Sequence, residues 1–129
     1  MKTLAIIIGL ILISLASYSQ TFKSTYVIKG KTDFETEMKD RVITISDKEI
    51  SISKFTGGTK TMYLTVDKIE EKEYSFNGKC KYYYCTTKDE DPINGYQKAI
   101  VIKKYDTVYM GLFATEIDMY LYQFSISKY

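Results

Sequence analysis

The stretch RVITISDKEISIS, residues 41–53, decides the fold class of this chain. In its first half Ile43 and Ile45 lie two residues apart, and in its second half Ile50 and Ile52 do the same. Alternation of apolar and polar residues with a period of two is typical of a strand with one buried face. The polar residues between the two halves are a natural hairpin connection, so this stretch predicts two antiparallel strands.

Strand signals continue from this hairpin toward the C-terminus. β-branched and aromatic residues dominate there, and the chain contains a single proline. Turn signals separate the segments at Gly57-Gly58, at Asn77-Gly78 and in the acidic loop 89–95. Asn-Gly is the strongest of them, because a type I′ turn requires a positive φ at both central residues. With a first strand near residues 26–29, we expect eight or nine strands.

Short turns between successive strands favour antiparallel neighbours. We therefore predict an all-β fold, an antiparallel meander of about eight strands that follows an N-terminal signal peptide. Two architectures fit this pattern, a small barrel and a two-sheet sandwich. Only residues 32–39 and 67–72 could hold a helical turn.

Residues 1–19 have the layout of a secretory signal peptide, with Lys2, a largely apolar stretch at 4–15 and small residues before an expected cut after Ser19. As a helix the apolar stretch would span about 18 Å, well short of the roughly 30 Å hydrocarbon core. We expect export by the general secretory route to the periplasm or the extracellular space, with no stable membrane anchor after cleavage. Residues 20–129 are expected to form a single all-β domain.

The composition argues against several functional classes. The formal net charge of the chain is +2, and removal of Lys2 with the signal peptide brings it closer to neutral. A nearly neutral chain whose sole arginine is Arg41 is poorly equipped to bind phosphates, so no nucleic-acid partner is expected. The absence of histidine removes the commonest general base and every triad that depends on it. We predict no catalytic residues and no enzymatic activity.

Carboxylate pairs are the remaining catalytic alternative, as in glycoside hydrolysis. The sequence offers two such pairs, Asp89 with Asp91 and Glu116 with Asp118. Acidic residues in the linkers of small β domains mostly keep the protein soluble. A carboxylate-dependent hydrolase is therefore the least favoured of the functional interpretations.

The segment CKYYYC, residues 80–85, contains both cysteines of the chain. In an extended strand the Cα atoms of Cys80 and Cys85 would lie about 16 Å apart, against a limit of about 7 Å for a disulfide. An exported protein permits the bond, but the spacing favours two buried free cysteines over a Cys80–Cys85 disulfide. We also expect no metal and no cofactor, because zinc requires four converging nitrogen or sulfur ligands and the loop 89–95 does not follow the EF-hand pattern.

The C-terminal half carries apolar or aromatic residues on both faces of its expected strands, and the chain has 13 tyrosines. Tyrosine offers a large rigid contact area together with a hydroxyl group. The candidate contact surface consists of Tyr83, Tyr109, Tyr120 and Tyr122. We therefore expect an exported, non-enzymatic binding or interaction module, whose partner is a protein or a small apolar ligand.

Two alternatives remain open beside this interpretation. The first is a small barrel that carries a hydrophobic ligand in its interior. The second concerns assembly, because the segment DMYLYQFSIS at 118–127 is uncharged after Asp118 and could pair as a strand edge. That segment predicts self-association through the C-terminal strand.

Overall fold

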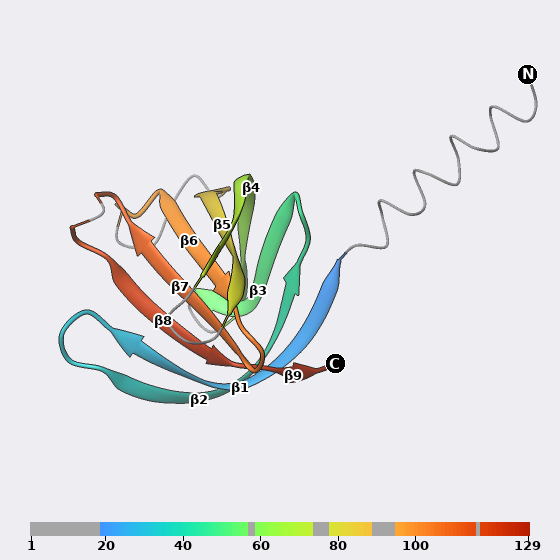
Figure 1. The fold of residues 1–129 in the computed structure, drawn as a ribbon. Coiled ribbons are helices and arrows are strands. Elements are labelled where there is room, and N and C mark those ends of the chain that lie inside the picture. The colour runs from blue at the N-terminus through green and yellow to red at the C-terminus, as the bar shows by residue number, and fades with distance from the viewer. Residues whose placement is uncertain (1–18, 57–58, 74–77, 89–94, 116) are drawn as a thin grey trace, which may run out of the picture.

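The computed structural model describes residues 19–56, 59–73, 78–88, 95–115 and 117–129 (Figure 1). These residues form strands and connections without any helix, so no helix among them is long and apolar enough to cross a membrane. The strands are β1 (Gln20–Gly30), β2 (Glu35–Ile45), β3 (Glu49–Thr56), β4 (Lys60–Glu73), β5 (Lys79–Thr87), β6 (Lys98–Lys103), β7 (Thr107–Phe113), β8 (Tyr120–Ser125) and β9 (Ser127–Lys128).

The strands close into an eight-stranded antiparallel barrel with one additional strand. Each strand from β1 to β8 pairs with the next one along the chain, and β8 pairs back with β1. The closing ladder aligns Val27 with Phe124, and β9 pairs with the first half of β1. The all-β meander predicted from the sequence is confirmed, and the structure selects the barrel over the sandwich.

The hairpin of β2 and β3 follows the predicted pattern. Ile43 lies opposite Ile52 and Ile45 lies opposite Ile50, with all four side chains buried. The turn between them is held by Ser46. Its hydroxyl oxygen accepts a hydrogen bond from the backbone amide of Glu49 at 3.0 Å and donates one to the carbonyl of Glu49 at 2.8 Å.

The core occupies the inside of the barrel. Alternate residues of every strand from β1 to β8 point inward, as the pleat of a strand requires. The largest fully buried side chains include Phe124, Leu64 and Met110. An eight-stranded barrel is just wide enough for such side chains to fill it.

The two segments that could have held a helical turn are strands instead. Residues 32–34 lie in the turn before β2, residues 35–38 begin β2 and pair with β1, and residues 68–72 belong to β4 and pair with β5. A β-bulge at Asp67 shifts the register between β4 and β5. Pairing on a sheet satisfies the backbone of both segments, and this long-range gain outweighs local preference. The first strand is also longer than expected, because it begins at Gln20.

The turn between β1 and β2 depends on Gly30, whose φ is 155°. A Cβ atom at this position would lie 2.3 Å from the carbonyl oxygen of Asp33, so a side chain does not fit. Successive strands run in opposite directions. The connections that follow β1, β3, β5 and β7 therefore lie at one end of the barrel. We call this the β1–β2 end.

The C-terminal segment is not a free edge over most of its length. β8 pairs with β7 on one side and with β1 on the other. Only the two residues of β9 lie at the end of the strand order. Self-association through the C-terminal strand remains a prediction, and in this structure β9 would have to provide the edge.

Several sequence predictions lie outside the described residues. They concern residues 1–18 of the expected signal peptide, the turns at Gly57-Gly58 and Asn77, the acidic loop up to Asn94, and Glu116.

Candidate functional site

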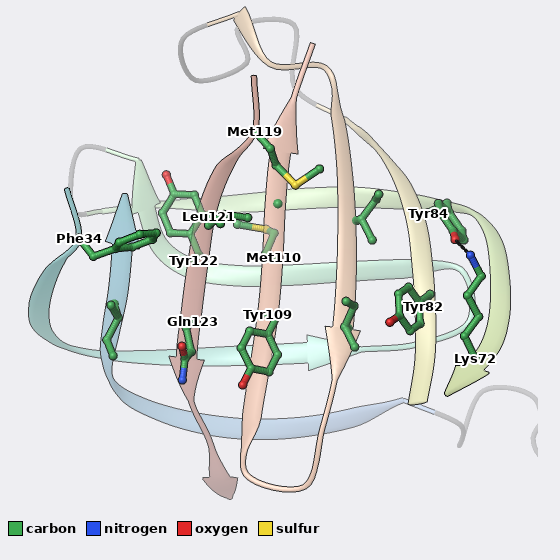
Figure 2. Close-up of a pocket in the computed structure, with 14 residues that line it drawn as sticks. Phe34, Lys72, Tyr82, Tyr84, Tyr109, Met110, Met119, Leu121, Tyr122 and Gln123 are labelled. Carbon is green, nitrogen blue, oxygen red and sulfur yellow. Dashed lines mark hydrogen bonds between the residues drawn. The ribbon is translucent and has the colours of Figure 1, made fainter. Parts of the chain in front are cut away.

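A groove of about 680 Å³ lies on the outer face of the barrel wall formed by β5, β6, β7, β8 and β1 (Figure 2). Its floor consists of two rows of residues that lie side by side across the strands. One row is Tyr82, Ile102, Tyr109, Gln123 and Ile28, and the other is Tyr84, Ile100, Gly111 and Leu121. The side chains of these rows point away from the core, because their neighbours in sequence fill the barrel.

The opposite wall of the barrel has a different outer face. The corresponding cross-strand row on β1 to β4 contains Thr21, Thr44, Ser51 and Tyr63. The hydroxyl groups of Thr21 and Thr44 lie 3.5 Å apart. One wall is therefore largely polar, as is usual for a surface in water, whereas the groove wall is largely apolar. A contiguous exposed apolar patch of this kind is characteristic of an interaction site.

Gly111 hollows the floor of the groove. Its lack of a side chain lets Met119, from the connection between β7 and β8, pack directly on the backbone. A Cβ atom on Gly111 would lie 2.2 Å from the Met119 sulfur. Methionine is a flexible and polarizable side chain that adapts to varied apolar partners. The groove thus has one adaptable residue over its centre.

Aromatic and charged side chains form the rim. Phe34, in the β1–β2 turn, is 54% exposed and borders one end. At the other end, the Nζ of Lys72 donates a hydrogen bond to the hydroxyl of Tyr84 at 2.8 Å (Figure 2). The same nitrogen lies 5.4 Å from the ring centre of Tyr82. The hydrogen bond to Tyr84 and the contact with Glu70 raise the pKa of Lys72, so its charge is retained at neutral pH.

The four tyrosines predicted as one contact surface do not lie on one face. Tyr109 lies in the groove, but Tyr83 is only 5% exposed and points into the barrel. Tyr120 and Tyr122 are half-buried on the inner side, opposite Leu112 and Met110. The register between β7 and β8 causes this division, because it places Gln123 beside Tyr109. Tyr122 nevertheless lines the groove together with Tyr109, whereas Tyr83 and Tyr120 do not (Figure 2).

The groove residues that sequence reasoning missed are mainly Tyr82, Tyr84, Ile100 and Ile102. A signal for them was present in the sequence. The segment AIVIK of β6 carries apolar residues at every position from Ala99 to Ile102, so it is apolar on both faces. The three consecutive tyrosines of β5 likewise supply both faces of that strand.

Both cysteines are buried free thiols. They lie five positions apart in β5, so the alternation of the strand places them on opposite faces. Burial, with a smaller contribution from the charge of Asp67, raises the pKa of Cys85 to about 12. A thiol with such a pKa is hardly ionised at neutral pH and is a poor nucleophile and metal ligand.

A charged trio lies on the inner side of the barrel near the β1–β2 end. The carboxylate of Glu37 accepts hydrogen bonds from Arg41 at 2.5 Å and from Lys29 at 3.1 Å. These two bonds lower the pKa of Glu37 to about 2, so the carboxylate stays ionised. The guanidinium carbon of Arg41 lies 5.8 Å from the ring centre of Phe124, which is fully buried.

The described residues offer little support for a catalytic carboxylate pair or a metal site. Of the two carboxylate pairs only Asp118 is fully described, and it forms an ion pair with Lys31 at 2.6 Å. Within the described ranges, no three acidic, cysteine or histidine residues cluster so that they could hold a metal ion.

No protein-family model, no curated protein and no solved structure matches this chain.

Proposed function

We propose that this protein is an exported, non-enzymatic interaction module that binds apolar side chains of a protein partner in the outer groove. The observation that supports it is the apolar outer face of β5 to β8 and β1, on a barrel whose opposite wall is polar. Burial of apolar surface contributes about 25 cal/mol per Å². An open groove with this lining therefore favours association with a partner over exposure to water.

The chemistry of the lining suits a protein partner. Tyrosine is enriched in protein interfaces, because it buries a large ring at low entropic cost and keeps a hydroxyl for a hydrogen bond. Tyr82, Tyr84 and Tyr109 contribute this chemistry, with the Lys72 ammonium at the rim. Binding energy in interfaces usually concentrates in a few anchors that enter such pockets. We expect one or two aromatic or aliphatic anchors of the partner to lie across Gly111 and Met119.

Site-specific crosslinking in the native host tests this proposal. A photoreactive phenylalanine analogue replaces Tyr109 in the groove or Tyr63 on the polar wall. We expect one crosslinked protein from position 109, and no such product from position 63. The additional substitution Ile102→Glu places a charge in the groove and should abolish the product. Equal crosslinking from both positions, or a product insensitive to Ile102→Glu, would show that the groove is not the binding site.

A further inference from the structure

The two ends of the outer groove differ in their charged groups. Figure 2 shows Phe34 at one end and Lys72 at the other. Near Phe34, Lys31 forms an ion pair with Asp118 at 2.6 Å, so this cation already has its counter-charge. At the other end the charged groups come from the outer face of β4. The groove therefore has a direction that a bound partner has to match.

Three charged side chains alternate along this face of β4. Lys68, Glu70 and Lys72 lie two residues apart from one another and pair across the ladder with the segment of β5 that carries the groove tyrosines. Both ammonium groups contact the one carboxylate of Glu70, that of Lys72 at 3.2 Å. Two cations share a single anion, so these three side chains carry one positive charge in excess.

The neighbouring acidic residue of β4 does not balance this excess. The carboxylate of Asp67 accepts a hydrogen bond from the hydroxyl of Thr86 at 2.5 Å. The same hydroxyl oxygen accepts a hydrogen bond from the Nζ of Lys98 at 3.0 Å. Asp67 is thus linked to a cation of its own through Thr86, and the excess charge stays with Lys68, Glu70 and Lys72.

The ammonium group of Lys72 lies over the groove tyrosines. Its nitrogen is 5.4 Å from the ring centre of Tyr82 and 5.5 Å from that of Tyr84. An ammonium carries three N–H donors. Tyr84 and Glu70 accept two of them, and the third has no acceptor among the residues that the structure describes. Because the side chain is 48% exposed, an acceptor from a partner can reach this donor.

The position of Lys72 sets its distance from the apolar centre of the groove. Its ammonium lies above β5, and Gly111 with the overlying Met119 lies on β7, two strands away. Neighbouring strands are about 4.8 Å apart, so the two positions are separated by about 10 Å. One segment of a partner spans this distance, with an apolar side chain at one position and a carboxylate at the other. A carboxylate that accepts from an ammonium forms a charge-assisted hydrogen bond, which is stronger than a neutral one.

We propose that the partner of the outer groove is acidic, and that it presents a carboxylate to Lys72 at about 10 Å from the apolar anchor that lies over Gly111 and Met119. This inference rests on the proposed function, because it assigns the chemistry of the partner at the same groove. An uncharged partner would cover the third N–H donor of Lys72 without supplying an acceptor, which costs free energy.

Selection from a random peptide library displayed on phage tests this inference with the immobilised mature protein. Peptides that also bind the Ile102→Glu variant are removed, so that the retained peptides depend on the groove. We expect these peptides to combine an apolar residue with aspartate or glutamate. One of them is then synthesised in three versions, with glutamate, glutamine or lysine at the acidic position, and fluorescence anisotropy measures their affinities.

The wild type should bind the glutamate version about two- to fivefold more tightly than the glutamine version, the range expected of a partly exposed ion pair. Lys72→Glu should reverse the order and favour the lysine version over the glutamate version. Lys60→Glu makes the same change of charge elsewhere on β4, outside the lining of the groove, and should keep the wild-type order.

The outcomes separate this inference from the proposed function. Groove-dependent peptides with equal affinity for the three versions would overturn the acidic partner and leave the apolar groove as the binding site. An order that Lys60→Glu changes as much as Lys72→Glu would also overturn it, since net charge would then be the cause. If every selected peptide binds wild type and Ile102→Glu alike, the groove does not bind peptide chains, and both proposals are overturned.

Discussion

Tyrosines that cannot be told apart in the sequence have different roles in the barrel wall. Tyr109 lies on the outer face between Ile102 and Gln123. Tyr122 lies on the inner face, where its ring stacks on Phe124 at 5.9 Å and contacts Phe55. Burial, with smaller contributions from Tyr120 and Tyr96, raises the pKa of Tyr122 against the opposing effect of the Arg41 charge, so the Tyr122 hydroxyl stays protonated. A change of one residue in register decides whether a ring supports the fold or is available to a partner.

Serine substitutions separate these two tasks. We expect Tyr122→Ser to lower the free energy of unfolding by about 3 kcal/mol, because it removes a packed ring from the interior. Tyr109→Ser should cost about 1 kcal/mol at most, since its ring lies outside the core. Urea denaturation followed by circular dichroism measures both values. Similar losses for the two variants would contradict the assignment of Tyr109 to the outer face.

The pKa of Glu37 gives a second prediction for a single residue. Its folded-state pKa of about 2 lies below the ordinary value of 4.5, so its ion pairs stabilise the fold above pH 4.5. This contribution is lost as the pH falls from 4.5 toward 2. We expect it to amount to about 1 kcal/mol, because the side chain is partly solvated.

Urea unfolding at pH 6 and at pH 2.5 measures this contribution for the wild type and for Glu37→Gln. The stability difference between the two proteins should be clear at pH 6 and should shrink at pH 2.5. Glu70→Gln is the matched control, because its ion pairs with Lys68 and Lys72 are on the exterior. A difference for Glu37→Gln that does not change with pH would exclude an electrostatic role.

Among the structural elements, the hairpin of β2 and β3 is the best example of what the sequence alone can predict. The alternation of Ile43, Ile45, Ile50 and Ile52 is a local signal, and the polar turn between the strands confirms it. Residues 35–39, by contrast, contain glutamate, methionine and lysine, which are good helix formers. They become a strand because β1 offers a partner to each residue from Glu35 to Met38.

The candidate site was predictable only in part, for a related reason. The sequence shows that β6, β7 and β8 are apolar on both faces, which correctly indicates a surplus of apolar surface. It does not show that Tyr109 and Tyr120 face opposite ways, because the connection at 114–119 separates the two strands. Alternation fixes faces within one strand, whereas the relation between strands depends on their register. Nothing in the sequence around Arg41 indicates that this side chain is buried.

Removal of the Ser46 hydroxyl tests the turn of the hairpin. The Ser46 side chain bonds to both backbone groups of Glu49, so Ser46→Ala should cost about 1 kcal/mol. Ser51→Ala, on the outer face of the same hairpin, is the matched control and should cost about 0.5 kcal/mol or less. Thermal unfolding measures both changes. Equal effects would mean that the turn does not depend on this hydroxyl.

The molecule as a whole depends on closure of the barrel by β1 and β8, which lie at opposite ends of the described chain (Figure 1). Closure pairs both edges of the meander and removes most of the free strand edge that would otherwise invite aggregation. It also separates an inner and an outer surface. The charged trio lies on the inner side of the wall, whereas the floor of the outer groove lies on its outer side.

Closure makes the reactivity of Cys85 a measure of global unfolding. This thiol is 2% exposed on the inner side of β5, and its raised pKa further suppresses reaction in the folded state. In a Cys80→Ser background, a thiol reagent at fixed pH should label Cys85 only through unfolding.

Val27→Ala weakens the closing ladder at a buried position opposite Phe124 and should cost about 2 kcal/mol. Where unfolding and refolding are fast relative to labelling, the rate should rise roughly 5–30-fold. An unchanged labelling rate, together with a measured loss of stability, would mean that Cys85 is reached by a local opening of the wall instead.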